Sequence, residues 1–253
     1  MDKRLKCVLG KSKAGDLLKK YNILKLVVRD KQYAQILYRN CESQILSDIP
    51  RTFPNSKWMT EVKNHVKIIE LLQIFLLHSN IGYLQGQLFI AIPLLKIYEK
   101  QQYLAFWSFI EITELLRPIY LSLLPRNSKG KIFSILKVID IWAQIKKIKV
   151  TPDQSEMLYH VLMWKFMSTL YFSIAGDSLN NVELLIDYFL HDIHNEQLFH
   201  AKLHAFSLAL MLSILHTKQI NFDKIALLSS CYLSTTALER VLNTSKQCEY
   251  LFI

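Results

Sequence analysis

The chain has 253 residues, of which 51% are hydrophobic, and a formal net charge of +10 at pH 7. With six glycines, six prolines and no low-complexity stretch, this composition excludes a disordered chain and indicates a compact globular protein. A basic balance suits nucleic acid, an anionic membrane or an acidic protein. The lysines and arginines form no basic stripe with interleaved aromatic residues, so we expect no nucleic-acid binding.

Cysteine usage and the N-terminus indicate the compartment. The cysteines lie far apart and match neither a CxxC motif nor a metal-ligand spacing, so we expect reduced thiols. The N-terminus has no apolar segment typical of a secretory signal. We therefore expect a cytoplasmic protein, with free thiols at Cys7, Cys41, Cys231 and Cys248.

The first strong helical signal covers residues 61–77. Apolar residues recur there at three- and four-residue spacings, which predicts one buried helix face; they are Val62, Val66, Ile69, Leu72 and Leu76. Residues 86–98 are almost wholly apolar and predict a buried helix. Residues 71–95 carry no formal charge, but a polar cluster at 78–87 favours two core helices over a membrane span.

Helical spacing continues to the end of the chain. It predicts helices over residues 101–123, 131–147, 153–173, 179–192, 195–216 and 221–242. Thr151-Pro152-Asp153 is typical of a helix start, and Asn221 or Asp223 can cap the last helix. No alternating strand pattern, fixed-period repeat or Pro/Gly/Ser-rich linker stands out. We therefore predict an all-α protein with a single multi-helix domain over residues 1–253.

One polar interruption of this pattern is Ile45-Leu46-Ser47-Asp48-Ile49-Pro50-Arg51-Thr52-Phe53-Pro54. Its two prolines stop or start helices and place Arg51 on a stiff segment. Taken alone, the segment fits a turn between helices, in which Asp48 caps a helix or forms an ion pair with Arg51.

The other interruption is Ile81-Gly82-Tyr83-Leu84-Gln85-Gly86-Gln87, directly before the buried helix. Taken alone, it fits a loop in which Gly82 ends one helix and Gln85 caps the next.

Together, the two segments resemble the signature of the TBC domain, the catalytic domain of activators of Rab-family GTPases. That signature has IxxDxxR followed by YxQG, matched here by residues 45–51 and 83–86. Segments at 105–116, 164–171 and 184–190 also resemble the family, so the likeness covers residues 40–215 and by continuity the rest. In these segments we expect Trp164 to be buried and Asp187 to be a partnered carboxylate.

The resemblance implies a mechanism for GTP hydrolysis. Arg51 is implied to be an arginine finger and Gln85 a glutamine finger, both supplied in trans to a Rab-type GTPase. Asp48, Tyr83 and Gly86 are implied to support them: Asp48 holds Arg51 or the local turn, and Tyr83 packs or hydrogen-bonds beside Gln85. The implied protein activates the hydrolysis carried out by the GTPase, acts in vesicle trafficking and lies peripheral to endomembranes. From the basic net charge we further expect its cationic surface to assist encounter with an anionic leaflet.

No cofactor of its own is implied, because GTP and Mg²⁺ belong to the partner GTPase. His200 and His204 are four residues apart but lack a carboxylate in an HExxH frame, so we expect no metal site.

Two other interpretations stay open. Gln87-Leu88 replaces the usual Met-Asn after YxQG, and residues 1–40 are short for the family's N-terminal part and contain no Trp. A catalytically inactive TBC-fold scaffold that binds a GTPase or another protein is therefore the alternative to an active GTPase-activating protein. The third is an unrelated all-α interaction or membrane-associated protein.

Overall fold

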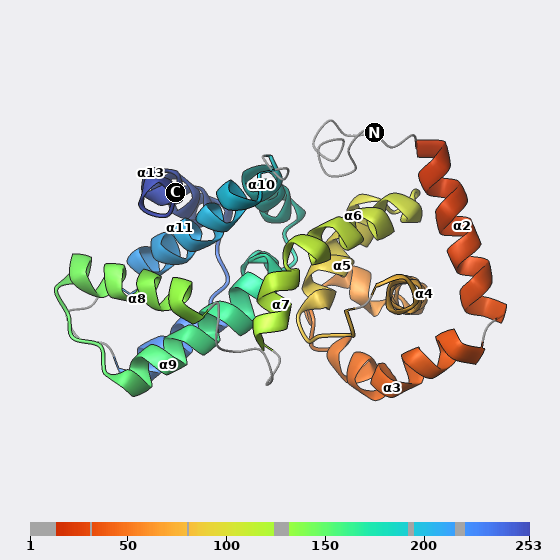
Figure 1. Cartoon of the computed structure of the whole chain (residues 1–253), viewed down its shortest axis with the longest axis horizontal. Coiled ribbons are helices and arrows are strands. Elements are labelled where there is room, and N and C mark those ends of the chain that lie inside the picture. The colour runs from red at the N-terminus through yellow and green to blue at the C-terminus, as the bar shows by residue number, and fades with distance from the viewer. Residues whose placement is uncertain (1–13, 31, 80, 124–131, 192–194, 216–220) are drawn as a thin grey trace. The chain divides into compact units, whose positions relative to one another are not determined.

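A computed structural model of the chain describes residues 14–30, 32–79, 81–123, 132–191, 195–215 and 221–253. Throughout these residues the regular elements are helices, which confirms the all-α prediction (Figure 1). The chain divides into two compact units, Met1–Arg117 and Pro118–Ile253. This division does not decide whether the chain is one domain, so that expectation stays a prediction.

The first unit is built around helix α4, Val62–His78. Helix α4 contacts all its neighbours in this unit: α2 (Ala14–Asp30), α3 (Gln32–Asp48), the 3₁₀ turn η1 (Lys57–Thr60), α5 (Gln87–Ile97) and α6 (Gln102–Leu115). Figure 1 shows α4 end-on among these helices. Its buried core includes Ile68, Leu71, Leu72 and Phe75.

The predicted inner face of α4 is wrong in its first half. Val62 and Val66 are 73% and 59% exposed, whereas Asn64 is fully buried. The amide of Asn64 donates to the carbonyl oxygen of Trp58 at 2.8 Å. A buried polar side chain is tolerated where it is hydrogen-bonded, so Asn64 and Ile68 face the neighbours and the two valines face water.

The pair of core helices joined by a polar turn is confirmed. Nearly every residue of α5 is buried, from Gln87 to Leu95, and a polar loop separates it from α4. Nowhere in the described residues does a helix have both the length and the apolar character needed to cross a membrane.

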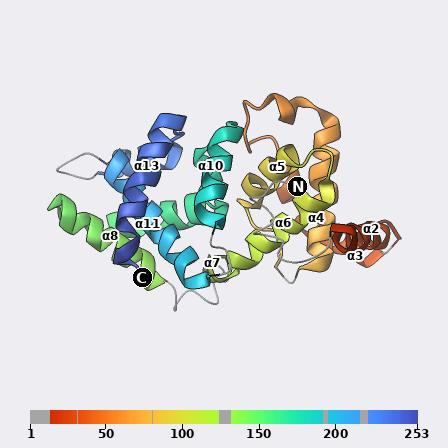
Figure 2. The same cartoon turned by 90° about the horizontal axis from the view of Figure 1, so that it is seen from above.

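The second unit is built around α11, Glu196–Ile214. Helix α11 contacts α8 (Ile132–Lys146), α10 (Leu179–Leu190) and α13 (Thr235–Cys248), and the views agree on these neighbours (Figure 2). The unit also contains α7 (Arg117–Leu123) apart from its first residue, α9 (Pro152–His160), α12 (Phe222–Ser230) and a 3₁₀ turn η5 (Glu249–Leu251). Residues Ala201–Met211 are buried on most sides of α11, as its apolar sequence predicts.

The predicted helix over residues 153–173 is broken. Helix α9 starts as predicted, with a capping box between Thr151 and Gln154. It runs into a π-helical turn, η2 (Val161–Phe166), and two 3₁₀ turns, η3 (Met167–Thr169) and η4 (Phe172–Ile174). Leu170 and Tyr171 have positive φ angles of 49° and 59°, which no helix tolerates.

Tyr171 explains this break. Its backbone N–H bonds with the carbonyl of Phe166 at 2.7 Å. Its hydroxyl donates to the carbonyl of Leu203 at 3.0 Å and also bonds with Ser207. Its ring stacks with Phe189 at 5.5 Å between centroids. These contacts of a fully buried ring with α10 and α11 offset the backbone strain.

The predicted helix over residues 221–242 is two helices, α12 and α13. Asn221 caps α12, as predicted. The link between the two helices is held by Leu233, whose N–H bonds with Ile174 O at 3.0 Å and whose carbonyl accepts from Asn181 at 2.9 Å. Ser234 then caps α13. Backbone bonds to distant elements therefore replace helix continuation here.

Trp164 corrects another expectation, because it is 40% exposed rather than buried. It lies in η2, where each residue advances less around the axis than in an α-helix. The buried positions of that turn are Leu162, Met163 and Phe166.

Candidate functional site

The IxxDxxR segment forms the end of α3 and the turn that follows. Ile45 and Ile49 are buried and anchor it to the core. The hydroxyl and N–H of Thr52 both bond with the carbonyl of Asp48, at 2.8 and 3.0 Å. The side chain of Arg51 leaves this turn with 58% of its surface exposed.

Asp48 lies at the centre of the site with 3% of its side chain exposed. Arg51 donates to its Oδ1 through Nε at 2.7 Å and also through Nη2. The hydroxyl of Tyr83 donates to its Oδ2 at 2.7 Å. The buried carboxylate of Asp48 therefore bonds both with Arg51 of the first motif and with Tyr83 of the second motif, which is 35 positions after Asp48.

Tyr83 is buried and positions the second motif. Burial, and then its hydrogen bond to Asp48, raise the pKa of Tyr83 far above its ordinary value. The phenol therefore stays protonated and remains a donor to the carboxylate. The sequence-based interpretation had Tyr83 beside Gln85, but the bond to Asp48 joins two distant segments and no local spacing indicated it.

Gln85 lies in the turn before α5 and is exposed. Gly86 follows with a φ angle of 107°, a conformation in which glycine avoids the steric cost of a side chain. The N-cap of α5 is Gly86, with no side-chain hydrogen bond, and α4 ends at His78 with Ser79 as its C-cap. The capping roles considered for Gln85 and Gly82 are therefore wrong.

Gln87 is a supporting residue that the motif comparison treated only as a departure. It is fully buried at the first position of α5. Its Oε1 accepts from the N–H of Leu84 at 3.2 Å, and its Nε2 donates to the carbonyl of Gly82 at 3.4 Å. These bonds hold the loop that carries Gln85. The sequence signal that could have indicated this role is a polar residue at the first position of an otherwise almost wholly apolar helix.

A second contact ties the motif segments together. The ring of Phe53, directly after Thr52, packs edge-on against Phe89 of α5 at 5.1 Å between centroids. With the bond from Tyr83 to Asp48, this contact places both motifs in one part of the first unit. The arrangement presents a guanidinium and an amide, two groups that bind phosphate oxygens or water without changing protonation.

The comparison with family models matches the Rab-GTPase-TBC domain over residues 7–220. The chain belongs to this family. The matched range includes both motifs and five-sixths of the chain. A comparison with curated proteins found no match. Membership implies a small GTPase as partner, since that is what the TBC domain acts on.

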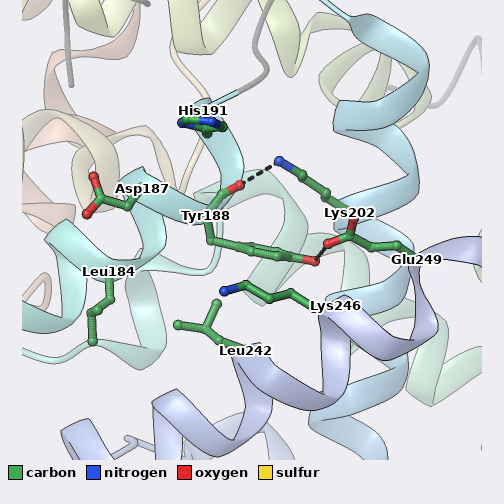
Figure 3. Close-up of a pocket in the computed structure, with 8 residues that line it drawn as sticks. All are labelled: Leu184, Asp187, Tyr188, His191, Lys202, Leu242, Lys246 and Glu249. Atoms are coloured by element: carbon green, nitrogen blue, oxygen red, sulfur yellow. Dashed lines mark hydrogen bonds between the residues drawn. The ribbon is translucent and has the colours of Figure 1, made fainter. Parts of the chain in front are cut away.

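The second unit contains a pocket of about 500 Å³ outside the motifs. It is lined by residues of α10 and its C-cap, α11, α13 and η5: Leu184, Asp187, Tyr188, His191, Lys202, Leu242, Lys246 and Glu249 (Figure 3). Tyr188 donates to Glu249 at 2.8 Å, and Lys202 donates to the carbonyl of Tyr188 at 3.0 Å. These polar groups bond with one another and are therefore less available to a ligand. The motif region is for this reason the stronger candidate for a functional site.

The described part of the chain contains no cluster of three potential metal ligands. His200 and His204 lie on α11, where His204 packs against Phe252 at 5.7 Å between ring centroids. Burial, then the nearby His200, lower the pKa of His204 to about 4. Asp187 was expected to be a partnered carboxylate. It lies exposed on α10 and is not without a partner.

Proposed function

We propose that this TBC domain stimulates GTP hydrolysis by a Rab-type GTPase through Arg51 and Gln85, supplied in trans. The observation that supports this most is the bond from Tyr83 to Asp48, because it fixes the two motif segments to each other while Arg51 and Gln85 stay exposed. A GTPase that docks there meets both side chains.

Arg51 is suited to phosphate chemistry. Its guanidinium is always charged, planar and able to donate to several oxygens at once. Charge that develops on the phosphoryl oxygens in the transition state is offset by such a group, and a finger of this kind contributes about 10³–10⁵ in rate. Since Asp48 holds the guanidinium in one orientation, part of its positioning is complete before the GTPase arrives.

The side chain of Gln85 is suited to orienting a water molecule. Its amide offers a carbonyl acceptor and two N–H donors, so it can orient a nucleophilic water beside the terminal phosphate. The chain supplies positioning and electrostatics, while GTP and Mg²⁺ come with the GTPase. This activity places the protein in vesicle trafficking in the cytoplasm, peripheral to endomembranes, because Rab GTPases are membrane-anchored.

A second candidate is a scaffold that binds a GTPase without accelerating hydrolysis. The ion pair favours it in one respect, because Arg51 already has a carboxylate partner in the free protein. Gln87-Leu88 in place of Met-Asn is the other observation in its favour.

Single-turnover GTP hydrolysis by a panel of Rab GTPases distinguishes the two. We expect wild type to accelerate at least one member, and Arg51→Ala and Gln85→Ala each to lower that acceleration by about 100-fold or more. Arg51→Lys should also be impaired, because an ammonium lacks the planar fork.

The chain offers a matched control in Arg117, which also pairs with an acid three residues earlier, Glu114, at 2.5 Å. Arg117→Ala should keep full activity. If a GTPase binds and wild type and Arg51→Ala are equally inert, the scaffold is correct. If no GTPase binds, both candidates are wrong.

A further inference from the structure

Helix α2 has one face packed into the first unit. Leu17, Tyr21 and Val28 are buried and fall on one side of the helix, because each residue turns the chain by 100°. The carbonyl of Leu17 accepts from the indole of Trp107 on α6 at 3.0 Å. These contacts fix which face of α2 is turned away from the unit.

The exposed side of α2 combines apolar side chains with lysines. Lys19, Ile23 and Leu26 lie opposite the buried face, and Leu18 and Lys20 lie at the two edges of this exposed side. Leu18, Ile23 and Leu26 are 41%, 51% and 59% exposed, and Lys19 and Lys20 beside them are exposed. We call these five residues the outer surface of α2. In both cartoon views α2 lies at an edge of its unit (Figures 1 and 2).

The charges of α2 separate into paired and unpaired groups. Lys25 and Arg29 approach the same acid, Glu70 of α4, at 2.8 and 3.7 Å. Lys19 and Lys20 form no ion pair with any residue that the structure describes. Asp16, in the first turn, is the one carboxylate among the described side chains of this helix.

The sequence concentrates positive charge in the same region. Residues 1–30 contain nine lysines and arginines against three aspartates, a net +6 out of +10 for the whole chain. This net charge favours contact with an anionic surface, and residues 121–150 carry an equal net charge of +6.

We propose that the outer surface of α2 docks on an anionic lipid bilayer. Single apolar side chains separated by lysines suit the headgroup boundary, where the apolar groups enter the acyl region and the ammonium groups stay with the phosphates. This deepens the proposed function by naming the surface that holds the domain beside a membrane-anchored GTPase, although lipid binding itself requires no GTPase.

The expected strength follows from the charges. A lysine close to an anionic leaflet strengthens binding about five-fold, and the effect fades beyond about 10 Å at 0.1 M salt. Lys19 and Lys20 together therefore account for about 25-fold at low salt. The three apolar side chains add a contribution that salt does not screen.

The test uses co-sedimentation of the whole protein with phosphatidylcholine vesicles, with and without phosphatidylserine at about one third of the lipid. We expect binding only to the vesicles that contain phosphatidylserine. Lys19→Glu/Lys20→Glu should weaken it by more than ten-fold, and Ile23→Ser/Leu26→Ser should remove the part that persists at high salt. The control Lys100→Glu/Lys149→Glu has the same net charge and alters two exposed lysines elsewhere, so its binding should change less than three-fold.

Equal losses in the two lysine variants would overturn the proposal, because general charge alone would then explain binding. Wild-type binding that ignores phosphatidylserine, or no binding, would also overturn it. GTP hydrolysis with a GTPase free in solution should be unchanged in Lys19→Glu/Lys20→Glu, so failure of this proposal and failure of GTPase activation are separate results.

Discussion

At the residue scale, Asp48 connects the two halves of the candidate site. Its carboxylate is buried and accepts from both Arg51 and Tyr83. Burying a charge is costly unless donors surround it. Each donor therefore stabilises the fold and the geometry of the site together, and the loss of either affects both.

Removal of the Tyr83 hydroxyl tests this connection. Tyr83→Phe deletes one donor to a buried charge, so we expect the free energy of unfolding to fall by about 1.5–3 kcal/mol in urea denaturation. GTPase activation should fall as well, because the two motif segments lose their direct bond. Tyr103→Phe is the control, since Tyr103 is half-buried and its hydroxyl forms no hydrogen bond with any residue that the structure describes, and it should change stability by less than about 0.5 kcal/mol. A loss no larger than this for Tyr83→Phe would contradict the role given to the bond.

The residues of the site differ in how far sequence could predict them. Asp48 and Arg51 are three positions apart at a helix end, so their ion pair was foreseeable from local spacing. The partner of Tyr83 was not, because a bond across 35 positions depends on how the loop before α5 folds against the end of α3. Exposure of Arg51 and Gln85 likewise follows from the packed fold.

At the element scale, α5 begins in an unusual way. It lacks a side-chain N-cap, and its own first residue, Gln87, reaches back to bond with Leu84 and Gly82 of the preceding loop. The first residue of the helix therefore orders the loop that carries Gln85, whereas no side chain of that loop caps the helix.

Gln87→Leu should disrupt that order. The part-buried N–H of Leu84 and the carbonyl of the exposed Gly82 lose their partner, which costs about 1 kcal/mol of stability, and activation should fall. In a double-mutant cycle, Gln87→Leu should cause little further loss of activation in a Gln85→Ala background, because it acts through that residue. The exposed Gln144→Leu on α8 is the control. Full additivity in the cycle would show that Gln87 acts elsewhere.

From residue 61 onward the helices themselves were largely predictable, and their interruptions were not, whereas α2 and α3 were not predicted. Apolar spacing located α4, α5, α8, α10 and α11 to within a few residues. The break after α9 occurs at Leu170 and Tyr171, which have positive φ angles although neither is a glycine. The sequence therefore contains no local signal for a helix break at this point. It exists because Tyr171 gains stacking and hydrogen bonds from α10 and α11, and such gains appear only in the packed unit.

At the scale of the whole molecule, a buried histidine links stability to pH. Burial, and then the nearby His200 and Lys137, together lower the pKa of His204 from 6.5 to about 4. Between these pH values the unfolded chain binds a proton that the folded chain does not. Folded stability therefore falls as pH drops through 6.5 and levels off near 4.

The magnitude is measurable by denaturation at several pH values. We expect His204 to account for a loss of about 3 kcal/mol between pH 7 and 4. His204→Gln, which does not titrate, should show a shallower dependence over this range. The exposed His160→Gln should leave the dependence unchanged. A wild-type profile no steeper than that of His204→Gln would contradict the neutral, buried state of this histidine.

The ion pair between Arg51 and Asp48 has a consequence for selectivity in solution. A guanidinium that already holds a buried counter-anion is a poor trap for free phosphate, chloride or stray nucleotides, because each must displace a carboxylate bound at 2.7 Å to Nε. Only an anion delivered at high local concentration competes well, as the phosphates of a docked GTPase are. Asp48 thus acts as a built-in competitor that keeps the guanidinium unoccupied by solutes until a partner is bound.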